Sequence, residues 1–126
     1  MSNYDLQKAH EYFRDKIAFT TGVHELDGII QRNKGDFTVV DVRYPADYAR
    51  GHVPGAVNLP KGKWQNPKGL SKTGINYLYC YSQTCHLAAE AAMELTRQGY
   101  QVMEVEGGWA EWEAKGYRIE QLAASA

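Results

Sequence analysis

Apolar residues recur along the chain in two periods, and each period predicts a different kind of element. In residues 5–16 they return every three or four positions, which is the spacing of one face of a helix. The same spacing reappears in residues 26–30, after a turn, and stops at the turn residues 33–36. The first part of the chain is therefore predicted to form two short amphipathic helices.

After these helices, short apolar runs alternate with helix-favouring runs. Residues 37–43 are dense in β-branched residues and too short for a helix, so they predict a strand. The adjacent apolar pair Val39 and Val40 indicates that this strand is buried on both faces, as in a parallel sheet. Residues 77–79 predict a second strand, and residues 87–95 predict a helix.

The last part of the pattern repeats this order. Residues 102–105 predict a strand, residues 107–108 a turn, and residues 109–115 a short helix. Strands that alternate with helices of about a dozen residues are typical of a parallel sheet covered on both faces. The pattern therefore predicts an α/β fold in which the sheet lies between two layers of helices.

Composition narrows the class of protein. The 126 residues carry 14 Lys and Arg against 15 Asp and Glu, and this formal net charge of -1 indicates no nucleic-acid partner. Hydrophobic residues make up 44% of the chain, too many for a disordered protein, yet no apolar run has the length of a membrane span. Because the N-terminus also lacks the pattern of a secretory signal, we expect a cytoplasmic protein.

The segment most suited to chemistry begins at Cys80. This residue follows a predicted strand, and the next helix begins near His86. In open parallel sheets the binding crevice lies beyond the carboxyl ends of the strands, and a helix N-terminus there favours a thiolate. Cys80 is therefore either an activated nucleophile or a small buried residue that ends a strand.

Three stretches of the chain resemble single-domain rhodanese-like sulfurtransferases. Residues 39–60, with Asp-Val-Arg followed by Gly-His-Val-Pro-Gly-Ala, are similar to the first motif of that family. Cys80 and the helix at 88–95 resemble its active-site loop and helix, and Glu-Gly-Gly-Trp at 106–109 resembles its closing turn. The resemblance, which covers residues 37–117, implies a three-layer α/β/α sandwich with a mainly parallel sheet of about five strands.

We divide the chain accordingly. Residues 1–20 are expected to be an N-terminal helical extension packed on the domain, residues 21–121 the rhodanese-like domain, and residues 122–126 a C-terminal tail. The extra helix either caps the sheet or forms a dimer seam, and the sequence leaves the oligomeric state open.

The resemblance implies an enzyme that transfers sulfane sulfur. Cys80 would take the outer sulfur of thiosulfate or a persulfide, carry it as a persulfide, and pass it to a thiol, a sulfur-carrier protein or another nucleophile. No cofactor is expected. The substrate-binding loop would comprise Tyr81, Ser82, Gln83, Thr84, Cys85 and His86, acting mainly through backbone groups.

This loop departs from better-known members of the family, whose loops usually contain a glycine and an Arg or Lys. Its only basic residue is His86, and a histidine is only partly charged near neutral pH. We therefore expect weak binding of anionic donors, which favours a persulfide donor over thiosulfate. Arg43 either pairs with Asp41 or Asp47, or lends positive charge to the rim of the pocket.

Cys85 opens further alternatives. Its thiol either resolves a Cys80 persulfide to a disulfide, which would make the protein a redox sensor, or replaces a Ser at the N-cap of the helix.

A rhodanese-like binding or regulatory module without turnover is the non-enzymatic alternative. Phosphatase activity is not expected, because no Arg lies between Cys80 and Arg97. No metal site is expected, because the cysteine spacing is not that of a zinc pair.

Two further residues are expected to be structural. His52 lies in a Gly- and Pro-rich turn whose unpaired backbone groups an imidazole can satisfy. Asp41, at a predicted strand end, is expected to cap a turn or anchor Arg43.

Overall fold

A five-stranded sheet organises the computed structural model, which describes residues 3–122. The strands are β1 (Thr20–Gly22), β2 (Phe37–Asp41), β3 (Val57–Asn58), β4 (Ile75–Tyr79) and β5 (Gln101–Glu106). Their spatial order is β1-β5-β4-β2-β3, and every neighbouring pair is parallel. The predicted parallel sheet of about five strands is confirmed, and β4 lies at its centre.

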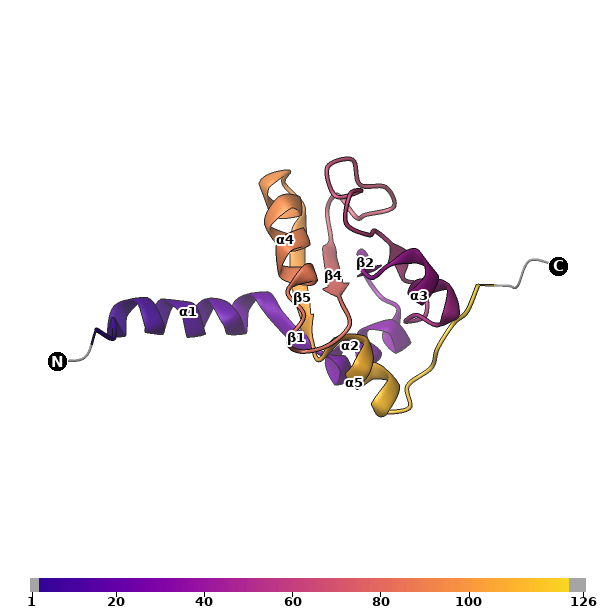
Figure 1. Ribbon diagram of the computed structural model, residues 1–126, viewed down its shortest axis with the longest axis horizontal. Helices are drawn as coiled ribbons and strands as arrows, with labels where there is room; N and C mark the ends of the chain where they lie inside the picture. Colours follow the sequence, from indigo (N-terminus) through magenta and orange to yellow (C-terminus); the bar gives the residue numbers. More distant parts are fainter. Residues whose placement is uncertain (1–2, 123–126) are drawn as a thin grey trace.

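Helices cover both faces of the sheet (Figure 1). They are α1 (Leu6–Phe19), α2 (Val23–Arg32), α3 (Pro45–Arg50), α4 (Leu87–Arg97) and α5 (Gly108–Ala114). Two separate apolar cores result. One joins Val40 and Leu78 to α4, and the other joins Val39 to α2 and α5. The neighbours Val39 and Val40 therefore point to opposite faces, as their pairing in the sequence predicts.

Two short elements differ from the sequence prediction. A turn was expected before the helical spacing at residues 26–30, but Thr20–Gly22 is an edge strand paired with β5, and α2 begins at Val23. Three residues without an apolar side chain carry no periodicity, so only the pairing with β5 defines β1. The six-residue α3 was also missed, although Pro45 at its first turn is a common helix-start residue.

The N-terminal helix projects from the rest of the molecule, and it contacts the sheet at β1 and β5. Figure 1 shows α1 extending away from the sheet, and none of its residues is buried. Its N-cap is Asp5, whose carboxylate accepts a hydrogen bond of 3.0 Å from the Lys8 amide. Residues 1–2 of the expected N-terminal extension and residues 123–126 of the expected tail lie outside the described residues.

No helix within residues 3–122 has both the length and the apolar character that crossing a membrane requires.

Candidate functional site

Cys80 follows directly after the central strand β4, at the carboxyl edge of the sheet. Residues 81–86 then turn back over this edge, and α4 begins at Leu87. Cys80 itself is 2% exposed and packs in the core beneath α4. A hollow of about 330 Å³ opens beside it, between this loop, α1 and the end of β5. The placement is the one that the strand-loop-helix pattern predicts.

The loop is held by its carbonyl groups. The oxygen atoms of Cys80 and Tyr81 accept hydrogen bonds of 2.8 and 2.9 Å from the amides of Trp109 and Ala110, in the first turn of α5. In contrast, among the described residues the amide groups of 82–84 have no hydrogen-bond partner. The loop thus fixes its acceptors and keeps its donors available to an anion.

The entrance to α4 is also uncapped. Its N-cap residue is His86, and no side chain accepts from the first amides of the helix. Such an end carries partial positive charge from the aligned peptide dipoles, which stabilises a thiolate or persulfide anion nearby. Because His86 holds the N-cap position, the alternative in which Cys85 caps the helix is wrong.

A disulfide joins Cys80 and Cys85, with the two Cα atoms 6.4 Å apart. Both residues line the same hollow. The curvature of the loop therefore brings the second thiol to the first, as the hypothesis of a resolving thiol requires.

Only part of the predicted loop lines the hollow with Cys80. Ser82, Gln83, Cys85 and His86 do so. Gln83 is fixed at both ends of its amide: its Oε1 accepts from the Gly107 amide at 2.5 Å, and its Nε2 donates to Glu106 at 2.9 Å.

Tyr81 and Thr84 are not among the residues that line the hollow. The Tyr81 hydroxyl donates to Asp47 at 2.5 Å and accepts from the amide of Tyr44, so its ring joins the loop to the start of α3. The Thr84 hydroxyl lies 3.3 Å from that of Ser82.

Three charged residues that the sequence did not reveal complete the wall of the hollow: Lys16, Glu104 and Glu106. Hydrogen bonds from Lys16 and from Gln83 lower the pKa of Glu106. The hydrogen bond between Lys16 and Glu106 also raises the pKa of Lys16. Burial and the neighbouring charge of Glu106 raise the pKa of Glu104. Two carboxyl groups thus face one lysine, which makes the wall acidic at neutral pH.

A signal for part of this wall exists in the sequence. Glu104 lies in the strand predicted at residues 102–105, and Glu106 follows two residues later, so both lie on the same face near the carboxyl end of β5. Lys16 has no such signal. It reaches the hollow only because α1 lies beside β5, a contact between segments about 90 residues apart in the chain.

Arg43 is not at the rim of this hollow. It is 2% exposed, and its Nη2 donates to Asp41 at 2.7 Å and to the Gly51 carbonyl at 2.6 Å. Its guanidinium lies 4.4 Å from the ring centroid of Trp109. Burial opposes its charge, but the hydrogen bonds and charge of Asp41 outweigh this, so the pKa of Arg43 is raised. Of the alternatives considered for Arg43, the structure shows the ion pair with Asp41. Asp41 therefore anchors Arg43, as the sequence predicted.

His52 is structural, as expected from its turn. Its Nδ1 lies 2.8 Å from the carbonyl oxygen of Tyr48, and the two rings stack with centroids 3.8 Å apart. Its backbone pairs in both directions with Glu120. His52 therefore joins α3 to the C-terminal segment and lies away from Cys80.

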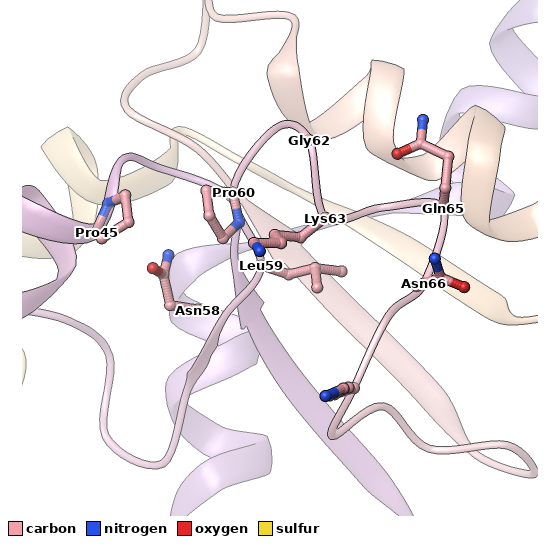
Figure 2. Close-up of a pocket in the computed structure, with 9 residues that line it drawn as sticks. Pro45, Asn58, Leu59, Pro60, Gly62, Lys63, Gln65 and Asn66 are labelled. Atoms are coloured by element: carbon pink, nitrogen blue, oxygen red, sulfur yellow. The ribbon is translucent and has the colours of Figure 1, made fainter.

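A larger hollow of about 580 Å³ lies along the connection between β3 and β4. It is lined by residues of that connection, and Figure 2 shows them with Pro45 on the side opposite Gln65 and Asn66: Asn58, Leu59, Pro60, Gly62, Lys63, Gln65, Asn66 and Lys68. It shares no lining residue with the hollow at Cys80. We place the candidate site at Cys80, because a cysteine, free amides and a helix N-terminus meet there. Within residues 3–122, no three His, Cys, Asp or Glu side chains are placed to hold a metal ion.

Comparison with known proteins agrees with this geometry. The model of the rhodanese-like domain family matches residues 22–115. The chain is 30% identical over 95 residues to the HTH-type transcriptional regulator Rv0324 of Mycobacterium tuberculosis, covering 74% of this chain and 42% of that protein. It is 32% identical over 79 residues to the uncharacterized protein YqhL of Bacillus subtilis, covering 61% of each. The chain therefore spans less than two thirds of either relative.

Solved structures are similar over most of the chain. The crystal structure of the BH2092 protein of Bacillus halodurans has a TM-score of 0.81 at 28% identity and covers 93% of this chain and 87% of its own, so the match includes part of α1. The rhodanese-like domain of Alr3790 from Anabaena has a TM-score of 0.71 at 27% identity, with 85% and 86% coverage. Thiosulfate sulfurtransferase from Pseudomonas aeruginosa has a TM-score of 0.69 at 26% identity, covering 82% of this chain and 19% of its own.

Proposed function

The chain belongs to the rhodanese-like domain family, and from this premise we propose that it is a sulfurtransferase that carries sulfane sulfur on Cys80. One observation carries the proposal: Cys80 lies between three unpartnered loop amides and the uncapped N-terminus of α4. These groups favour negative charge on sulfur, both in the thiolate and in the persulfide. The similarity to a thiosulfate sulfurtransferase adds support.

The reaction has two steps. The Cys80 thiolate attacks the outer sulfur of the donor, and the S–S bond of the donor breaks, so that sulfite or a thiolate leaves with the electron pair. The product is a Cys80 persulfide anion, stabilised by the loop amides. A thiolate acceptor then attacks the outer sulfur and releases the Cys80 thiolate, which restores the enzyme. No net oxidation of the protein occurs in this cycle.

The charge of the wall favours a persulfide donor over thiosulfate. Glu104 and Glu106 face the hollow, and Lys16 is already paired with Glu106. A dianion that enters this hollow meets acidic groups with no free permanent cation among the described lining residues. A low-molecular-weight or protein persulfide brings less negative charge to the same place.

The disulfide supports a second candidate function, a thiol-disulfide redox sensor. A Cys85 thiolate can attack the inner sulfur of a Cys80 persulfide, forming the Cys80–Cys85 bond that the structure contains. The bond between the two sulfurs of the persulfide breaks, and hydrosulfide leaves with the electron pair. A dithiol reductant would return both cysteines to thiols.

Mass spectrometry of the reduced protein tests both functions. The wild type, Cys80→Ser and Cys85→Ser are each treated with a low-molecular-weight persulfide and, separately, with thiosulfate. A gain of one sulfur atom that requires Cys80 and persists in the wild type supports simple transfer. Loss of two hydrogens in the wild type, with sulfur retained only in Cys85→Ser, supports the redox sensor. No change that depends on Cys80 would reject both and favour a non-catalytic binding module.

A charge substitution tests the choice of donor. Glu106→Gln removes one negative charge and frees Lys16, so the KM for thiosulfate should fall by about threefold to tenfold. Glu113→Gln, on the exposed face of α5, is the matched control and should leave the KM unchanged. An unchanged or higher KM in Glu106→Gln would show that the acidic wall does not select the donor.

A further inference from the structure

The helix α1 carries an apolar face that no part of the described chain covers. Leu6, Phe13 and Ile17 lie on one side of the helix, at spacings of seven and four residues, and Leu6 and Ile17 are 78% and 80% exposed. An isolated helix of 14 residues is only marginally stable in water. Such a helix needs a partner surface to remain folded.

An apolar groove lies next to this helix. It has a volume of about 600 Å³ and separates α1 from α4, and Met93 on its α4 side is 76% exposed. Its apolar lining consists of Tyr12, Phe19, Ala89, Ala92, Met93 and Val102. One chain therefore carries the apolar face of α1 and an apolar groove side by side. Two copies related by a twofold axis can then bury equivalent surfaces against each other.

The exposed area of the chain is large enough for such an interface. The surface measures 8175 Å², whereas a compact monomer of 14.2 kDa exposes about 6,800 Å². The excess of roughly 1,400 Å² exceeds the approximately 800 Å² per partner that a standard specific interface buries. The net charge of -1 adds little repulsion between two copies.

We propose that the apolar face of α1 and the groove beside it are covered by a second copy of this chain, in a dimer with twofold symmetry. The two copies bury equivalent surfaces, so each supplies what the other leaves exposed. Tyr12 and Lys16 line both the groove and the hollow at Cys80. The dimer therefore also holds α1, with its lysine, in place beside Glu106. This proposal does not depend on sulfur transfer.

Sedimentation velocity of the full chain, over about 5 to 200 µM, tests the dimer. The wild type should sediment as a dimer. The double variant Leu6→Asp, Ile17→Asp should raise the dissociation constant at least roughly a hundredfold, because each copy then brings two charged side chains in place of two apolar ones to the proposed interface. The matched control is Gln7→Asp, Ala18→Asp, which places the same charges one residue further on, on the polar side of the helix. It should remain dimeric.

Circular dichroism and thermal unfolding establish that each variant keeps the folded sheet domain, which the substituted helix residues do not join. A monomeric wild type at the highest concentration would overturn the proposal. So would a dimer that survives Leu6→Asp, Ile17→Asp, since another surface must then form it. Equal loss of the dimer in the control variant would show that charge on α1, and not its apolar face, decides assembly.

Discussion

Gly108 lies directly against the carbonyl oxygen of Cys80. A Cβ atom added to Gly108 would stand 2.6 Å from that oxygen and 3.1 Å from the amide nitrogen of Ser82, so no other residue fits there without displacing the loop. Gly108 also has a φ of +58°, in the left-handed region that favours glycine. The Gly-Gly turn at the start of α5 therefore sets the position of Cys80.

Replacing Gly108 with alanine should displace the Cys80 loop. We expect the free energy of unfolding to fall by about 2–4 kcal/mol, from backbone strain and steric overlap together, and the rate of persulfide formation to fall with it. Gly116→Ala is the matched control, because Gly116 has a φ of +72° but open space around its Cα atom. It should cost only about 1 kcal/mol in urea unfolding. Equal losses of unfolding free energy in the two variants would show that the contact between Gly108 and Cys80 does not affect stability.

The ion pair of Asp41 and Arg43 should be a main determinant of stability. Asp41→Asn leaves the buried guanidinium without its partner charge, so unfolding by urea should show a loss of about 3–5 kcal/mol. Glu94→Gln removes a charge from the ion pair with Arg97, which water screens, and should lower the free energy of unfolding far less than Asp41→Asn does. A small loss in Asp41→Asn would mean that water reaches Arg43.

The two glutamates of the acidic wall should respond to pH in opposite directions. Burial and the charge of Glu106 raise the pKa of Glu104, so its contribution to stability is greatest at low pH and is lost as the pH rises through the raised pKa. Glu104→Gln should therefore be nearly neutral at about pH 4 and stabilising, by less than about 1 kcal/mol, at about pH 8. Thermal unfolding at both pH values measures this difference.

Glu106 provides the internal comparison. Hydrogen bonds from Lys16 and Gln83 lower its pKa, so its stabilisation is present above the ordinary carboxyl range and is lost on acidification. Glu106→Gln should therefore be destabilising at neutral pH and nearly neutral in acid. The same pH trend in both variants would contradict the assigned partners.

Reduction of the disulfide should lower stability. A cross-link that closes the short loop from Cys80 to Cys85 lowers the conformational entropy of the unfolded chain. In the chain-entropy account this raises the free energy of unfolding by about 2 kcal/mol. The wild type should thus unfold at a lower urea concentration after treatment with a dithiol. Cys85→Ser should show no response to the dithiol. If both proteins respond equally, the effect lies outside this disulfide.

The sequence alone determined the class of fold and the place of Cys80 in it. Val39 and Val40 predicted a strand buried on both faces, and the helix-favouring run at 87–95 predicted the element that follows Cys80. These predictions succeeded because periodicity and intrinsic propensity act over neighbouring residues. The residues around Cys80 could thus be placed at the carboxyl edge of the sheet without any knowledge of the tertiary structure.

The tertiary structure decided what depends on contacts between distant segments. It paired Arg43 with Asp41, made Thr20–Gly22 a strand beside β5, and brought Lys16 to Glu106 across about 90 residues. It also left Tyr81 and Thr84 out of the lining of the hollow that their neighbours line. Nothing in the local pattern specifies these partners, because a side chain's charge and size are compatible with many neighbours until the packed sheet and helices leave only one within reach.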